Sequence, residues 1–134
     1  MNKQKLAIVN HDKGYNCCQA VACAFADEID MDEKILFKAG EGFGLGMGCT
    51  ECTCGAISGA IMVAGFKNST ANLEGEKSKE ATYQLSKEIV RKFGDKNGAL
   101  LCKDLKGTET GKVLRSCTGC IEDAAALVEE ILGL

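Results

Sequence analysis

Three cysteines stand close together in the stretch GMGCTECTCGAISGA, residues 46–60. A deprotonated cysteine binds soft metal ions and attacks disulfides, so Cys49, Cys52 and Cys54 are the first candidates for chemistry. The chain has nine cysteines in all, and the other six are Cys17, Cys18, Cys23, Cys102, Cys117 and Cys120. Because nine is an odd number, these thiols cannot all pair within one chain.

The composition predicts a single cytoplasmic domain. A length of 134 residues suits one domain, predicted here over residues 1–134. A net charge of -3 gives no basic footprint for nucleic acid, and no segment approaches the roughly 18 apolar residues of a membrane span. Cellular reductants keep cytoplasmic thiols reduced, so metal binding or redox chemistry is favoured over a static disulfide framework.

Three of the cysteines fall at or just before the predicted start of a helix. They are Cys17, Cys54 and Cys117. Free backbone N–H groups and the helix dipole favour a thiolate at such a position and lower the pKa of the thiol. Both metal ligation and disulfide exchange require a thiolate. The alternative is that cysteine packs here as a small hydrophobic residue, which is the preferred interpretation for Cys23.

Two CxxC units are present, CTEC at residues 49–52 and CTGC at residues 117–120. Two such units are the common framework of a four-thiolate zinc site, although the gap between them is far longer than in a zinc ribbon. Neither unit is followed by histidine, so no haem is expected. The ferredoxin spacing is also missing, whereas an iron–sulfur cluster of unusual spacing stays open.

Hydrophobic periodicity indicates helices almost throughout the chain. The predicted helical stretches are residues 4–13, 17–28, 32–39, 54–66, 76–93, 99–105 and 118–132. Asn16 is expected to cap the second stretch, and Gly94 is expected to end the helix over 76–93. The predicted fold class is all-α, a compact bundle of five to six helices with a glycine-rich loop before a small-residue helix.

Glycine occupies every even position from Gly40 to Gly48. The even spacing never produces GxGxxG, and no GK[ST] follows, so a phosphate-binding loop is not predicted. We interpret the run as irregular backbone that closely approaches another group, with a flexible surface loop as the alternative. In the next helix, Gly55 and Gly59 lie one turn apart and predict close packing against another backbone, within the chain or between two chains.

Five stretches carry a family resemblance: GYNCCQAV (14–21), GFGLGMG (42–48), CGAISGAIMVAG (54–65), LLCKDL (100–105) and CTGCIEDAAALVEEIL (117–132). Together they resemble the C_GCAxxG_C_C family, small bacterial and archaeal domains regarded as redox proteins. The likeness runs nearly end to end. It implies that the four characteristic family cysteines are Cys17, Cys54, Cys102 and Cys117. The remaining cysteines are additional to that set.

The resemblance implies a redox role without specifying the reaction. The candidate redox-active or metal-ligating residues are Cys17, Cys54, Cys102 and Cys117. The candidates for additional metal ligands are Cys49, Cys52 and Cys120. The candidate cofactor-binding residues are Gly46, Gly48 and Gly55, because glycine lets the backbone approach a bound group closely.

The leading hypothesis is a cytoplasmic redox or electron-transfer protein that uses an iron–sulfur cluster or a dithiol/disulfide centre. The alternative is a non-redox module or scaffold that holds zinc through thiolates. The simplest alternative is a bundle that uses cysteine only for packing. The expected partner is a redox protein, with no nucleic acid and no membrane, and a homodimer through the Gly55 and Gly59 face is a further prediction.

Overall fold

The computed structural model describes residues 2–134, and its regular structure is helical. The elements in chain order are α1 (Lys3–Asp12), α2 (Cys17–Ala24), α3 (Glu33–Gly40), η1 (Glu41–Phe43), α4 (Gly44–Met47), α5 (Gly55–Asn68), α6 (Lys79–Asn97), α7 (Cys102–Lys106) and α8 (Cys117–Leu132). Within residues 2–134, strand pairing is limited to an isolated antiparallel bridge between Thr53 and Leu101.

The all-α prediction is confirmed. The predicted count of five to six helices is too low for the described residues, because each of the predicted helical stretches forms a separate helix and the glycine-rich segment adds the short turns η1 and α4. Residue 1 of the predicted domain lies outside the described residues, and the single-domain assignment over 1–134 stays a prediction.

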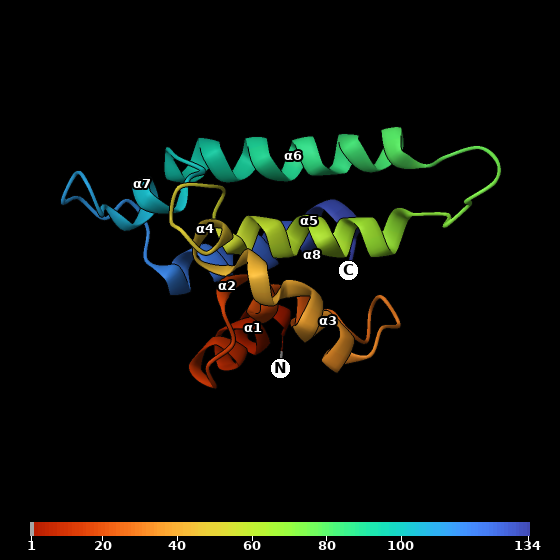
Figure 1. Ribbon diagram of the computed structural model, residues 1–134, viewed down its shortest axis with the longest axis horizontal. Helices are drawn as coiled ribbons and strands as arrows, with labels where there is room; N and C mark the ends of the chain where they lie inside the picture. The colour runs from red at the N-terminus through yellow and green to blue at the C-terminus, as the bar shows by residue number, and fades with distance from the viewer. Residues whose placement is uncertain (1) are drawn as a thin grey trace.

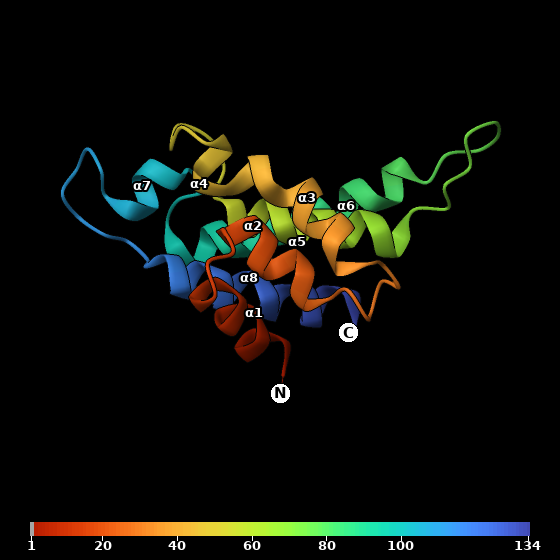
Figure 2. The same ribbon diagram turned by 60° about the horizontal axis from the view of Figure 1, so that its bottom comes forward.

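Helix α5 runs through the middle of the molecule, with α6 along one side and α1, α2 and α3 on the other (Figure 1). Turning the molecule shows α8 lying beside α1 (Figure 2). Helix α5 contacts α2, α6 and α8 along its length. Helices α2, α5 and α8 all begin at the end of the molecule that carries α4 and α7 (Figures 1 and 2). Three helix N-termini are therefore gathered at one end.

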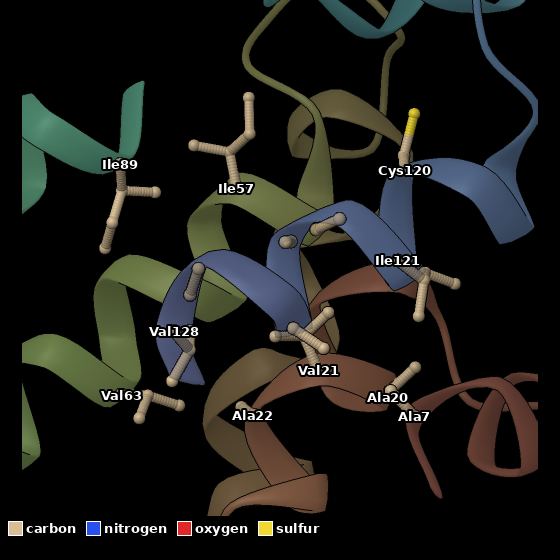
Figure 3. Packing of buried hydrophobic residues seen from close by; sticks show 14 of the residues in the cluster. Ala7, Ala20, Val21, Ala22, Ile57, Val63, Ile89, Cys120, Ile121 and Val128 are labelled. Atoms are coloured by element: carbon tan, nitrogen blue, oxygen red, sulfur yellow. The ribbon is translucent and has the colours of Figure 1, made fainter. Parts of the chain in front are cut away.

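The hydrophobic core lies where α5 meets its neighbouring helices (Figure 3). Ile57 and Val63 of α5, Ile89 of α6 and Val128 of α8 are fully buried. Burying an aliphatic side chain of this size contributes roughly 1.5–3 kcal/mol, so this packing fixes the helices relative to one another. Cys120 stands at the edge of this cluster, and its sulfur points away from Val128 (Figure 3).

The glycine face of α5 packs closely against other elements of the same chain. A Cβ atom at Gly59 would stand 2.6 Å from the carbonyl oxygen of Cys18 in α2. A Cβ atom at Gly55 would stand 3.2 Å from the Cα of Gly44 and 3.3 Å from the Cβ of Cys17. The predicted close packing is confirmed as a contact within the chain. The homodimer through this face stays a prediction, and it would have to displace α2 or α4.

Two predicted helix ends were wrong. Helix α6 continues through Gly94 and ends at Asn97. Gly98 follows it with a φ of +78°, the left-handed conformation that favours glycine after a helix C-terminus. Helix α2 ends at Ala24, four residues earlier than predicted. There the N–H of Phe25 donates to the carbonyl of Ala22 instead of continuing the α-helical pattern. The fully buried Phe25 side chain anchors this turn.

The glycine-rich segment adopts the irregular backbone that its sequence predicts. Four consecutive residues have left-handed φ values: Leu45 at +55°, Gly46 at +58°, Met47 at +64° and Gly48 at +79°. Such a conformation costs a non-glycine residue about 1–2 kcal/mol. The turn is closed by a 2.8 Å hydrogen bond from the N–H of Gly48 to the carbonyl of Gly44. It lies against the starts of α5 and α7.

Candidate thiol site

A cavity of about 200 Å³ opens at the end of the bundle where α2, α5 and α8 begin. Five of the nine cysteines line it: Cys17, Cys54, Cys102, Cys117 and Cys120. The other lining residues are His11, Asn16, Leu45, Gly55, Leu105, Lys106 and Arg115. The four cysteines named by the family resemblance therefore reach one place, together with one that the resemblance did not include.

Capping residues place two of these thiols in the first turn of a helix. The Asn16 side chain accepts a hydrogen bond from the N–H of Gln19, and the Gln19 side chain accepts one from the N–H of Asn16. This capping box makes Cys17 the first residue of α2. The Ser116 side chain accepts from the N–H of Gly119 at 3.0 Å and makes Cys117 the first residue of α8. The prediction that these cysteines lie at helix starts is confirmed.

Cys54 is the residue immediately before α5. The backbone N–H groups of Ala56 and Ile57, in the first turn of α5, lower the pKa of its thiol. Its own N–H donates to the carbonyl of Leu100 at 2.8 Å, which ties the start of α5 to the segment before α7. The predicted position at a helix start is confirmed for Cys54 as well.

Cys17 at the start of α2 and Cys117 at the start of α8 are neighbours in the cavity, and hydrogen bonding between their thiols has the largest effect on the pKa of each. The hydrogen bond from Cys17 and the positive charge of Lys106 lower the pKa of Cys117 to about 5, against the opposing effect of burial. The same hydrogen bond, together with burial, raises the pKa of Cys17 well above its ordinary value. The pair therefore consists of a thiolate at Cys117 and a protonated donor at Cys17.

Cys54 and Cys120 form a second pair of the same kind between α5 and α8. The hydrogen bond from Cys120 and those from two backbone N–H groups lower the pKa of Cys54 to about 7, while burial opposes them. The hydrogen bond to Cys54 and burial raise the pKa of Cys120 well above its ordinary value. Each pair thus joins one acidic thiol to one that keeps its proton at neutral pH.

Lys106 supplies a positive charge to this group of sulfurs. Its Nζ donates to the Sγ of Cys117 at 3.6 Å, and the negative charge of Cys117 raises the pKa of Lys106. Cys102, at the other end of the same helix α7, is only 6% exposed. Burial and the charge of Cys54 raise the pKa of Cys102, against the lowering effect of Lys106. Cys102 therefore stands in the cavity as a neutral thiol.

Two of the three predicted cofactor-binding glycines lie against site residues. A Cβ atom at Gly46 would stand 2.5 Å from the Cβ of Cys102 and 2.8 Å from the carbonyl oxygen of Cys52. Gly55 allows the corresponding approach of α5 to Cys17 and lines the cavity itself. A Cβ atom at Gly48 would meet no other atom within 4 Å, so close packing does not require glycine there. Its φ of +79° is the feature that favours glycine at this position. A cofactor contact at these three glycines stays a prediction.

The other cysteines lie outside the cavity. Cys49 and Cys52 are exposed, and Cys18 and Cys23 are buried. Cys18 packs near Gly40, and the thiol of Cys23 donates to the carbonyl of Glu33 at 3.7 Å. The packing role expected of Cys23 agrees with this environment.

Two site features were missed or undervalued by the sequence reasoning. Cys120 ranked only as an additional ligand, although it lines the cavity and pairs with Cys54. Lys106 was not singled out, although it follows Cys102 by four residues and so lies on the same face of a helix. The CxxC spacing could have placed Cys120 in the site, because residues three apart on a helix are neighbours and Cys120 follows Cys117 by three.

The donor set of the cavity matches the chemistry of a soft metal, since thiolates are the ligands of zinc and of iron–sulfur clusters. Their arrangement fits less well. In the part of the chain that the structure describes, no three histidine, cysteine, aspartate or glutamate side chains come together in a way that could hold a metal ion. A bound metal would require the cavity thiols to change their arrangement.

The fold and the cavity define a class: an all-α protein with several cysteines gathered at the starts of its helices. Residues 15–131 match a family model described as "Putative redox-active protein (C_GCAxxG_C_C)". The chain therefore belongs to the C_GCAxxG_C_C family, as its motifs predict. The comparisons with curated proteins and with solved structures give no match.

Proposed function

We propose that this protein is a thiol–disulfide redox protein in which Cys17–Cys117 and Cys54–Cys120 are two dithiol/disulfide couples. One observation carries the proposal: Cys17, Cys117, Cys54 and Cys120 line one cavity as two neighbouring pairs, and one member of each pair has a lowered pKa. Disulfide exchange needs a thiolate to attack and a second thiol close by to resolve the intermediate. Each pair provides both.

The reaction is a transfer of two electrons to a disulfide R–S–S–R′. The thiolate of Cys117 attacks one sulfur, forms a mixed disulfide Cys117–S–S–R and releases R′S⁻, which takes up a proton. Cys17 then loses its proton to solvent and attacks the Cys117 sulfur, which forms the Cys17–Cys117 disulfide and releases RS⁻. The products are one protein disulfide, RSH and R′SH. The Cys54–Cys120 pair reacts by the same steps, and each step is reversible.

The surroundings of the pairs suit this exchange. Lys106 and the N-terminus of α8 stabilise the negative charge of Cys117. The backbone N–H groups at the start of α5 do the same for Cys54. Cys117 is half-buried, so a small disulfide can reach its sulfur from the cavity. Cys54 is buried, which makes its pair the inner of the two couples.

The test is disulfide mapping of the purified protein. The protein is equilibrated anaerobically with reduced and with oxidised dithiothreitol, alkylated, digested and analysed by mass spectrometry. We expect disulfide-linked peptides that join Cys17 to Cys117 and Cys54 to Cys120 in the oxidised sample, and free thiols in the reduced one. Identical alkylation in both samples would contradict the proposal.

A soft-metal centre is the second candidate, because five sulfurs line one cavity. Cys17, Cys54, Cys102 and Cys117 would be the ligands, with Cys120 as an additional one. An iron–sulfur cluster would supply one-electron transfer, whereas zinc would supply structure without redox change. Elemental analysis, labile-sulfide assay and a visible spectrum of anaerobically purified protein separate these cases from the metal-free dithiol centre. Iron with sulfide in stoichiometric amounts would favour the cluster over the dithiol couples.

The proposed partner is a redox protein that supplies or receives the electron pair. The described chain contains no helix of the length and apolar character that a membrane crossing needs. A cytoplasmic location is part of the same proposal.

A further inference from the structure

Two of the cysteines that the proposed couples leave unused form a CxxC unit. Cys49 and Cys52 belong to the CTEC unit between α4 and α5, and both are exposed, in contrast to the half-buried or buried thiols of the cavity. Their CxxC spacing is the one that thiol–disulfide oxidoreductases use. We call these two residues the outer dithiol.

Backbone pairing holds the outer dithiol beside α7. The N–H of Cys102 donates to the carbonyl of Cys52 at 2.9 Å, and the N–H of Lys103 donates to the carbonyl of Thr50 at 2.9 Å. The Thr53–Leu101 bridge continues this pairing. The segment that carries the outer dithiol is therefore fixed against the residue that begins α7, which is the cavity thiol Cys102.

Gly46 brings Cys49 near the side chain of Cys102. The thiol of Cys49 donates to the carbonyl of Gly46 at 3.6 Å. A Cβ atom on the same glycine would stand only 2.5 Å from the Cβ of Cys102. Cys49 and Cys102 therefore lie against the same residue. The charge of Cys49 also contributes to the raised pKa of Cys102.

We infer that the outer dithiol is a second redox site, which exchanges with disulfides of partner proteins. The disulfide formed at this site is then transferred by exchange through Cys102 to the inner Cys54–Cys120 pair. This inference rests on the proposed thiol–disulfide function. The substrate class follows from size: a cavity of about 200 Å³ admits a small molecule, but a folded partner cannot bring its disulfide to a buried sulfur. An exposed dithiol has no such restriction.

The relay consists of balanced exchanges. The outer dithiol first reduces the partner disulfide to two thiols and becomes the Cys49–Cys52 disulfide. Cys102 loses its proton and attacks Cys49, which gives a Cys49–Cys102 disulfide and releases Cys52 as a thiolate that takes up a proton. The thiolate of Cys54 attacks Cys102 and releases Cys49, which is protonated in turn.

Cys120 then loses its proton and attacks Cys54, and the released Cys102 thiolate takes up a proton. The net result is an oxidised inner pair, a reduced outer dithiol and a reduced partner. Cys102 and Cys120 give up two protons, and the released thiolates of Cys52, Cys49 and Cys102 take up three. The third proton comes from solvent, because Cys54 enters the sequence as a thiolate and ends in a disulfide.

The first experiment compares two oxidants on the full chain and on the variant with both Cys49→Ser and Cys52→Ser. One oxidant is 2-hydroxyethyl disulfide, and the other is the oxidised form of a strongly oxidising thioredoxin-fold protein. Formation of the Cys54–Cys120 disulfide is followed by rapid alkylation and mass spectrometry. The matched control is Glu51→Gln, which changes one of the two residues between the thiols and keeps both thiols.

We expect the variant to lose at least about tenfold in rate with the protein oxidant, because the only exposed dithiol among the described residues is removed, and to keep its rate with the small disulfide. The control should match the wild type with both oxidants. An unchanged rate with the protein oxidant would overturn the relay. An equal loss with both oxidants would overturn its assignment to protein disulfides.

The second experiment looks for the linking disulfide itself. In the variant with both Cys52→Ser and Cys54→Ser, the thiols that would resolve a Cys49–Cys102 disulfide are gone. We expect this disulfide to accumulate on oxidation and to appear as one pair of linked peptides. Its absence, in a protein whose wild type forms the cavity disulfides, would overturn the relay alone. A wild type that forms no cavity disulfide with either oxidant would overturn the proposed function and the relay together.

Discussion

Replacing Lys106 by methionine should raise the pKa of Cys117 and slow its reactions at neutral pH. The Nζ of Lys106 and the Sγ of Cys117 are 3.6 Å apart. Coulomb's law for two unit charges at this separation gives about 1 kcal/mol with the dielectric constant of water and about 4–5 kcal/mol with an effective value near 20. Because one pKa unit corresponds to about 1.36 kcal/mol, the loss of Lys106 should raise the pKa by about 1–3 units.

The assay is the rate of alkylation of Cys117 by iodoacetamide as a function of pH, resolved by peptide mass spectrometry. Wild-type Cys117, with a pKa of about 5, should react at an almost constant rate from pH 6 upward. Over about three pH units above pH 6, the rate of the variant should still rise, because its thiol is not yet fully deprotonated. The matched control is Lys103→Met. Lys103 lies on the same helix, but it pairs with Glu51 and Glu109 at the surface. A variant whose pH profile matches that of the wild type would refute the role assigned to Lys106.

Three further predictions concern the same site and its support. Cys17→Ala removes the hydrogen bond that contributes most to the lowered pKa of Cys117, so the alkylation profile of Cys117 should move to higher pH; a profile that stays in place would contradict the pairing. Gly46→Ala should lower the free energy of unfolding by about 1–3 kcal/mol more than Gly48→Ala, because both positions have positive φ but only Gly46 also lacks space for a Cβ atom; urea denaturation measures this difference, and equal losses would contradict it. Asp123→Asn should cost about 1–3 kcal/mol at neutral pH, because this buried carboxylate accepts hydrogen bonds from a partly exposed arginine and lysine. The pKa of Asp123 is lowered, so its contribution is complete above the ordinary carboxyl range and is lost as the pH falls through the lowered value. The difference in urea midpoint between Asp123→Asn and the wild type should therefore shrink in acid, and a difference that persists would contradict the charge-based origin.

The positions of the helices could largely be predicted from sequence, because hydrophobic period and capping are local properties. Asn16 and the apolar residues after it were enough to place the start of α2 and with it Cys17. The end of α6 was misplaced because Gly94 and Gly98 both suit a helix C-terminus. Only the left-handed φ of Gly98 distinguishes them.

The candidate site was less predictable, because it depends on how distant helices cross. The motifs predicted four of the cavity cysteines, but the pairing of Cys54 with Cys120 depends on the crossing of α5 and α8. The contact of Lys106 with Cys117 depends in the same way on the loop that returns the chain from α7 to α8. No local pattern encodes these approaches.

The exposure of Cys49 could not be predicted either. Sequence proximity to Cys54 suggested a shared site, whereas the left-handed turn at residues 45–48 directs the CTEC unit to the surface.

The central claim is that the cavity sulfurs exchange electrons in pairs by forming disulfides. A potentiometric titration of the anaerobic protein tests it most directly, with free thiols counted by alkylation and the visible spectrum recorded at each potential. The account predicts two-electron behaviour, a tenfold change in the ratio of oxidised to reduced protein for every 30 mV or so, with two thiols lost per couple and no visible colour. A one-electron slope of about 59 mV accompanied by a visible absorption change, or a constant thiol count across the titration, would contradict it.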